Sequence, residues 1–125
     1  MGLFRTRRDT GQQAEAHAQA YLCRQGLIPV ERNYHCKVGE LDLIMREPTG
    51  ELVFVEVRYR RHASHGGAVG SIDRHKQQRL LRAAAHYLLQ RGLSQQPCRI
   101  DVLALEGELA SGPNVTWLRN AIEAY

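Results

Sequence analysis

The stretch that decides the fold is GELDLIMREPTGELVFVEVRYR, residues 39–60, in which two apolar runs flank a short polar connection. Each run has the length and the apolar content of a β-strand. The connection is Pro48-Thr49-Gly50, and Pro and Gly suit a tight turn. The sequence therefore predicts an antiparallel hairpin of strands 39–47 and 51–60.

Acidic residues recur at alternate positions inside the first run of this hairpin. Successive side chains of a strand point to opposite faces of the sheet. We therefore expect Glu40 and Asp42 to share one face. On the same grounds we expect the other face to carry Leu41, Leu43 and Met45. The first strand should thus present one acidic face and one apolar face.

The second run sorts its side chains in the same way. One face should carry Val53, Val55 and Val57. The opposite face should carry Phe54, Glu56, Arg58 and Arg60. Antiparallel neighbours can bring Asp42 and Glu56 onto a common face, where two carboxylates repel each other and resist ionisation unless a positive charge lies between them.

Two interpretations of this acidic pair remain open. A divalent cation would satisfy both carboxylates, and oxygen ligands with water suit Mg²⁺ or Mn²⁺ and leave room for the phosphate oxygens of a substrate. Arg58 and Arg60 would then hold those phosphates through their forked donors, which points to a phosphodiesterase. Alternatively, carboxylates paired with arginines on the exposed face of an antiparallel sheet are common and need no metal.

The rest of the chain predicts a mixed sheet flanked by helices. The spacing of Ala14, Ala18 and Leu22 predicts a helix over 12–25 that ends at Gly26. The other predicted elements are an edge strand at 27–36, a flexible loop at 61–71, a helix from Asp73 to about Arg91, and strands at 98–106 and 114–122. This order indicates the α/β class, and the long crossover before strand 98–106 favours its parallel pairing with strand 51–60.

Length and charge indicate one domain with an anionic partner. The 125 residues fit a single compact domain over 1–125, with residues 1–10 expected to be a flexible N-terminal segment. Lys and Arg number 17 against 13 for Asp and Glu, which gives a net charge of +4. The positive charge is concentrated in 58–82, where Asp73 is the only acid. Such a segment favours an anionic partner.

The cysteines and the hydropathy pattern predict the cellular compartment. Cys23, Cys36 and Cys98 form no C-x-x-C pair, so we interpret them as buried thiols in a reducing cytosol. The N-terminal segment contains basic residues without a following apolar run, and no later stretch approaches the length of a membrane span. We expect a soluble cytoplasmic protein without a membrane partner.

Several ordered blocks carry a family resemblance that covers nearly the whole chain. They are GQQAEAHAQAYLCRQGL, RNYHCKVGELDLIMRE, LVFVEVRYRRHASHGGAVGSI, KQQRLLRAAAHYL and CRIDVLAL. These blocks resemble the YraN family of small bacterial proteins. That family is itself similar to the PD-(D/E)xK nucleases and to the archaeal Holliday-junction resolvases. The resemblance implies a restriction-endonuclease-like core and an activity on nucleic acid, with DNA preferred.

The resemblance also implies a metal site. The nuclease pattern begins with an Asp, which Asp42 matches. It closes on the next strand with an acidic residue, any residue and a Lys, which Glu56, Val57 and Arg58 match. By this carry-over, Asp42, Glu56 and the backbone carbonyl of Val57 would bind Mg²⁺ or Mn²⁺. Glu15 matches the acidic residue that such nucleases place on their first helix, where it completes or supports the metal site.

Arg58 departs from the pattern, because the family position usually carries a Lys. An arginine does not lose its proton in proteins and cannot act as a general base. It can still stabilise negative charge that develops on the phosphate. Lys37 and Lys76 are the two lysines of the chain, and Lys76 lies on the predicted helical stripe with Leu80, so it is the candidate for the missing role. A solvated Lys76 in the first helical turn is the alternative.

The sequence thus predicts a Mg²⁺- or Mn²⁺-dependent endonuclease-like phosphodiesterase. The predicted catalytic residues are Asp42, Glu56, Arg58 and Lys76. The predicted contacts with the nucleic-acid backbone are Arg58, Arg60, Arg61, Arg74, Lys76 and Arg79. Two alternatives are a binding module of the same fold without catalysis, and a structural or adaptor protein whose acidic hairpin is a salt-bridged sheet face. Related resolvases work as dimers, so a homodimer is a further option.

Overall fold

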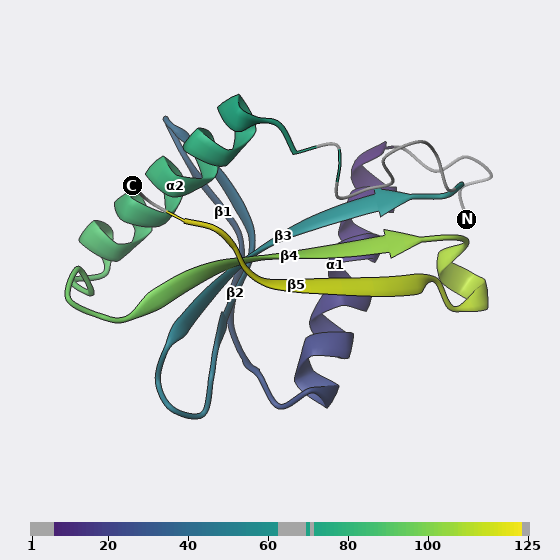
Figure 1. Cartoon of the computed structure of the whole chain (residues 1–125), viewed down its shortest axis with the longest axis horizontal. Helices are drawn as coiled ribbons and strands as arrows, with labels where there is room; N and C mark the ends of the chain where they lie inside the picture. The colour runs from purple at the N-terminus through teal and green to yellow at the C-terminus, as the bar shows by residue number, and fades with distance from the viewer. Residues whose placement is uncertain (1–6, 63–69, 71, 124–125) are drawn as a thin grey trace.

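The computed structural model describes residues 7–62, 70 and 72–123. Figure 1 shows the elements, which in chain order are α1 (Arg7–Arg24), β1 (Ile28–Cys36), β2 (Gly39–Arg46), β3 (Leu52–Arg60), α2 (Arg74–Gln90), β4 (Cys98–Glu106), the 3₁₀ turn η2 (Leu109–Ser111) and β5 (Asn114–Ile122). Within these described ranges, no helix is long and apolar enough to cross a membrane.

The strands form one sheet in the order β1-β2-β3-β4-β5. β3 and β4 are parallel, and all other neighbours are antiparallel. This arrangement confirms the predicted α/β class, the hairpin, the parallel crossover and the edge position of β1. The hairpin turn closes as predicted, because the Gly50 N–H donates to the carbonyl of Glu47 at 2.8 Å and Gly50 adopts a φ of 103° that favours glycine.

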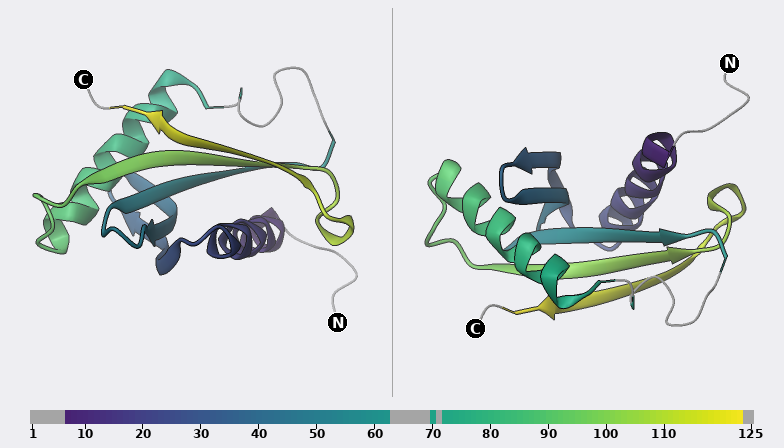
Figure 2. Two further views of the ribbon diagram at one scale, coloured as in Figure 1. Left: turned by 60° about the horizontal axis from the view of Figure 1, so that its bottom comes forward. Right: turned by 90° about the horizontal axis from the view of Figure 1, so that it is seen from above.

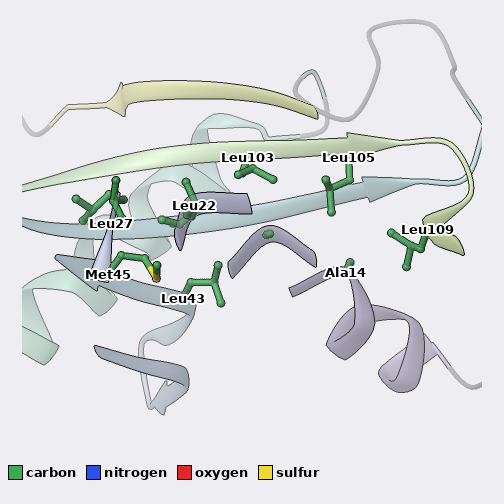
Figure 3. Close-up of a cluster of buried hydrophobic side chains, with 11 residues drawn as sticks. Ala14, Leu22, Leu27, Leu43, Met45, Leu103, Leu105 and Leu109 are labelled. Carbon is green, nitrogen blue, oxygen red and sulfur yellow. The ribbon is translucent and has the colours of Figure 1, made fainter. Parts of the chain in front are cut away.

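The helices cover opposite faces of the sheet (Figure 2). On one face, Ala14, Ala18 and Leu22 of α1 pack against the strands, and Figure 3 shows Leu22 among strand residues such as Leu43 and Leu103. The cluster beneath α2 includes Leu41, Ile44, Phe54, Leu80, Tyr87 and Val102. Burial of one leucine side chain contributes roughly 2 kcal/mol, so these clusters fix both helices on the sheet.

Two features place the start of α2 beside the start of β2. Asp73 caps the helix by accepting a hydrogen bond from the Lys76 N–H at 2.8 Å, which confirms the predicted cap. Gly39 lies against the second turn of the helix, where a Cβ would come within 3.1 Å of the Arg79 carbonyl oxygen. A side chain here would require the Arg79 carbonyl to shift by a few tenths of an ångström, so glycine favours this close approach, which brings the cations of α2 close to the acidic residues of β2.

The first helix begins earlier than the sequence predicts. α1 starts at Arg7, so residues 7–10, which were expected to be flexible, form its first turns. Asp9 lies in that first turn, where a negative charge interacts favourably with the helix dipole. Residues 63–69 and 71 of the predicted loop lie outside the described residues.

The expected face of Leu41 is wrong. Leu43 and Met45 pack beneath α1, but Leu41 packs in the cluster beneath α2. The residue of β1 that faces Asp42 in the register is Asn33, and its φ of 56° is left-handed. Leu41 and Leu43 are two residues apart but pack on opposite faces, so the alternation of β2 changes at Asp42, just where the pairing of β2 with β3 ends.

The expected burial of the cysteines is also wrong. Cys23 and Cys98 are exposed, and Cys36 is half-buried. Cys23 follows the buried Leu22 and falls on the outer side of α1, and Cys98 is the first residue of β4. All three thiols are free.

Candidate functional site

A cavity of about 230 Å³ lies where β2 and β3 separate, between α1 and α2. Its acidic lining residues are Glu15, Glu40, Asp42 and Glu56, and its basic ones are Arg58, Lys76 and Arg79. Val57 also lines it. The structure therefore brings all the predicted metal ligands and all the predicted catalytic residues to one place.

The cavity exists because the hairpin opens at its acidic residues. The β2–β3 pairing runs from Arg46 and Leu52 to Leu43 and Val55, and the next residues in register would be Asp42 and Glu56. A side chain replaces the backbone pairing there, because the Val57 N–H donates to Asp42 Oδ2 at 2.9 Å. Figure 1 shows β3, β4 and β5 continuing side by side away from β1 and β2.

Asp42 and Glu56 form a hydrogen-bonded pair of carboxyl groups. Glu56 is only 5% exposed. Burial, followed by the charge of Asp42, raises the pKa of Glu56 to about 8. Burial likewise raises the pKa of Asp42. A hydrogen bond between two carboxyl groups requires a proton, so a pair without a bound cation shares one at neutral pH.

Glu15 of α1 is a third acid with an unfavourable environment. Burial, followed by the charge of Asp42, raises the pKa of Glu15 to about 7. Its Oε1 atom is buried and has no hydrogen-bond partner within the part of the chain that the structure describes. Arg32 and Asn33 of β1 oppose this shift, Arg32 through its charge and Asn33 through a hydrogen bond. Sequence reasoning missed both residues, since neither lies on the acidic hairpin.

The cations of the cavity come from β3 and α2. Arg58 Nη1 lies 3.4 Å from Glu56 Oε2, and the Arg58 side chain is 22% exposed. Lys76 is half-buried, lines the cavity and lowers the pKa of Glu56 through its charge, so it faces the acids rather than open solvent. Arg79, one turn further along the helix, is exposed at the rim.

Three predicted nucleic-acid contacts lie outside the cavity. Arg60 is exposed at the end of β3, and Arg61 is paired with Glu108 at 3.0 Å. Arg74 lines a separate groove of about 600 Å³ along α2, together with Arg82. The predicted contacts are therefore divided, with Arg58, Lys76 and Arg79 at the cavity and the other three outside it.

The donors of the cavity fit a hard divalent cation. Carboxylate and carbonyl oxygens are the ligands that Mg²⁺ and Mn²⁺ prefer. The unpartnered Oε1 of Glu15 and the carboxyl pair of Asp42 and Glu56 are the groups that such a cation would satisfy. Among the described residues, no three acidic, His or Cys side chains are already gathered around one point. One or two carboxylates with water and substrate phosphate are the usual shell of Mg²⁺, so the donor set is sufficient.

Asp101 belongs to a different cluster. It is fully buried on β4, where its carboxylate accepts hydrogen bonds from Arg99 Nε at 3.0 Å, Trp117 Nε1 at 2.9 Å and the Asn120 N–H at 2.8 Å. Arg99 also contacts Glu47. The sequence left open whether Asp101 faces the acidic pair or a strand neighbour, and the structure places it with its neighbours.

Comparison with known proteins identifies the family. A family model described as "Uncharacterised protein family UPF0102" matches residues 14–105. The chain belongs to this family. UPF0102 is the YraN family, so the resemblance in the sequence blocks is confirmed. The matched span contains every charged residue that lines the cavity.

Relatives in this family align with nearly the whole chain. The UPF0102 protein of Alcanivorax borkumensis is 46% identical over 122 residues, which cover 97% of this chain and 97% of that protein. The UPF0102 protein of Cupriavidus necator is 55% identical over 115 residues, which cover 90% of this chain and 82% of that protein.

Two solved structures also match the chain at low identity. A chain of an EndoMS–dsDNA complex aligns with a TM-score of 0.42 and 16% identity, covering 80% of this chain and 36% of that chain. The SfsA protein of Pyrococcus furiosus in complex with Ca²⁺ aligns with a TM-score of 0.41 and 16% identity, covering 93% of this chain and 66% of that chain. This UPF0102 chain thus spans about a third of the first protein and just under two thirds of the second.

Proposed function

We propose that this protein is an endonuclease-like phosphodiesterase that acts on nucleic acid, preferably DNA, with Mg²⁺ or Mn²⁺ as its cofactor. The observation that carries the proposal is the hydrogen-bonded pair of the half-buried Asp42 and the buried Glu56 in an open cavity edged by cations. Buried acids with raised pKa values in a cleft are typical of functional sites. Acids for a metal and cations for phosphate oxygens together match a phosphodiester substrate.

The residues of the cavity divide into two groups by charge. Asp42 and Glu56 would hold the metal, with the carbonyl of Val57 and the carboxylate of Glu15 as further oxygen donors. When bound, the cation supplies Lewis-acid chemistry, which neutralises phosphate charge and activates water. Asp42 also accepts the hydrogen bond from the Val57 N–H, so it fixes the backbone whose carbonyl is a proposed ligand.

The cations stabilise negative charge on the phosphate. The ion pair with Glu56 keeps the Arg58 guanidinium at the cavity, where its forked donors would bind phosphate oxygens. Arg58 acts as an electrostatic stabiliser, because a guanidinium does not give up its proton. Lys76, which lies in the same cavity, provides the ammonium group that the nuclease pattern usually places at the position of Arg58.

The surface around the cavity would hold the flanking nucleotides. Arg79 lines the cavity, and Arg60, Arg61 and Arg74 lie outside it, at or just after the end of β3 and at the start of α2. Contacts of this kind release counterions from the nucleic acid, so affinity should fall steeply as salt concentration rises.

Cleavage of labelled single-stranded, duplex and branched DNA with Mg²⁺ or Mn²⁺ tests the proposal. The native protein is compared with Asp42→Asn and Glu56→Gln, purified identically, and with an EDTA control. We expect cuts that disappear in both variants and in EDTA. Uncut DNA, or equal cutting by the variants, would refute the catalytic assignment.

A second candidate function rests on Arg58. An arginine at the lysine position favours a binding module that has kept the fold and lost catalysis. This alternative predicts DNA binding that persists in EDTA and produces no cuts. The variant Arg58→Lys separates the two functions further. An active enzyme should retain or increase its cleavage rate, and a binding module should remain inactive.

A further inference from the structure

Gly11 lies inside helix α1, where a glycine is unfavourable. The helix spans Arg7–Arg24, so Gly11 has helical residues on both sides. Gly11 is not one of the described glycines with positive φ, so an ordinary residue could adopt its backbone conformation. Relative to alanine, a glycine within a helix lowers the ratio of folded to unfolded molecules about fivefold. The helix itself therefore gives no reason for glycine at this position.

Packing does not require a glycine at position 11 either. A Cβ atom built on Gly11 meets no heavy atom of the described residues within 4 Å. Gly39 is the opposite case, since a Cβ there would lie 3.1 Å from the Arg79 carbonyl oxygen. The space beside Gly11 is therefore open, and none of the described residues fills it.

This open space belongs to the cavity with the acidic pair. Gly11 lines that cavity, and α1 also contributes Ala14 and Glu15 to the lining. Residues three or four positions apart share one side of a helix, so Gly11 lies on the same side of α1 as Glu15. A side chain at position 11 would therefore occupy part of the cavity.

Positive charge lies one helical turn before Gly11 on the same side of α1. Arg7 and Arg8 precede Gly11 by four and three residues, and both are exposed. Asp9, the acid that follows them, is two residues from Gly11 and therefore points to another side of the helix. Since α2 contributes two cations to the cavity lining, positive side chains come from both helices.

We propose that Gly11 keeps the surface of α1 clear for the sugar–phosphate backbone of a nucleic acid, beside the phosphate that reaches the acidic pair. Glycine is the residue that lets a ligand come close to a protein backbone. Nucleic acid is the ligand that fits, because its phosphates match the cations of both helices. The inference rests on the proposed function and adds to it the path by which the strand crosses α1.

Replacement of Gly11 by larger residues tests this role. Gly11→Ala should raise Tm by about 2 to 5 °C, because alanine favours a helix and its Cβ meets none of the described atoms. Gly11→Leu should be at least as stable as the native protein, since leucine is also a good helix former. The affinity for DNA should nevertheless fall as the side chain grows, by about 10- to 100-fold for leucine. Fluorescence anisotropy of labelled single-stranded and duplex DNA, in EDTA and again with Mg²⁺, measures this affinity.

Ala16→Leu is the matched control, because Ala16 is exposed on the same helix and does not line the cavity. It should leave the affinity for DNA unchanged. Equal affinities of Gly11→Leu and the native protein would overturn the inference while leaving the proposed function intact. A lower Tm of Gly11→Ala would also overturn the inference, since the chain itself would then need the space. A native protein that binds DNA neither in EDTA nor with Mg²⁺ would overturn both the inference and the proposed function.

Discussion

Replacement of Glu56 by glutamine should make the metal-free protein more stable at alkaline pH. Glu56 is 5% exposed and shares a hydrogen bond with Asp42. Glutamine has nearly the same shape, remains neutral at every pH and can donate a hydrogen bond to Asp42. The substitution therefore removes the penalty of a buried charge without creating a cavity.

The size of the effect follows from the pKa of Glu56, which rises from 4.5 to about 8 on folding. Between these two values the folded protein binds more protons than the unfolded chain, so the free energy of unfolding falls as pH rises and the contribution of the protonated carboxyl is lost above pH 8. At about 1.4 kcal/mol per pKa unit, the upper limit is roughly 5 kcal/mol. Arg58 can move toward the ionised Glu56, so we expect about 2 to 4 kcal/mol.

Urea unfolding in EDTA at several pH values from 5 to 9 measures this difference. The native protein should lose stability across the range, and Glu56→Gln should show a flatter profile that crosses above the native one. Folding also raises the pKa of Glu15 to about 7, so the free energy of unfolding of Glu56→Gln should still fall somewhat as pH rises. Glu108→Gln, at an exposed ion pair with Arg61, is the control and should change stability by less than about 1 kcal/mol. Parallel profiles for native protein and Glu56→Gln would refute the reasoning.

Three further predictions address the metal, the second acidic cluster and the position of α2. Mn²⁺ at about one hundred times its Kd should stabilise the native protein by about 2.7 kcal/mol, and the accompanying rise in Tm should be absent in Asp42→Asn; equal rises in both would exclude Asp42 as a ligand. Asp101→Asn should lower the free energy of unfolding in urea by about 3 kcal/mol, because Arg99 loses a buried carboxylate 3.0 Å away, and an unchanged midpoint would contradict this. Gly39→Ala should cost about 1 to 3 kcal/mol, since its Cβ would lie 3.1 Å from the Arg79 carbonyl oxygen; native stability would show that α2 can shift freely.

The fold was predictable wherever a local pattern determined an element. The turn at 48–50, the cap at Asp73 and the apolar run at 98–106 each depend on nearby residues, and the structure contains all three features. The start of α1 was not predictable in this way, because residues 7–10 have few apolar side chains to reveal a helical period. Residues 7–10 extend a helix whose later residues Ala14, Ala18 and Leu22 pack against the sheet.

The candidate site was predictable only in part, for a related reason. Asp42 and Glu56 share a pattern along two adjacent strands, so alternation and hairpin pairing could bring them together. Arg32 and Asn33 lower the pKa of Glu15 from another element of the fold, a relation that no apolar or charge period reveals. The side on which Leu41 packs was missed because the alternation of β2 changes at Asp42.

The two buried acidic clusters of the sheet differ in how their charges are satisfied. Asp101 is buried, and its two oxygens accept hydrogen bonds from Arg99, Trp117 and the Asn120 backbone at 2.8 to 3.0 Å. Donors from the chain itself therefore satisfy the charge of Asp101. The pair of Asp42 and Glu56 instead faces a cavity, and the ion pair of Glu56 with Arg58 has the longer distance of 3.4 Å. A fold that needed these acids only for stability would gain from apolar residues in their place. The contrast favours a cation from outside the chain as the missing partner of the pair.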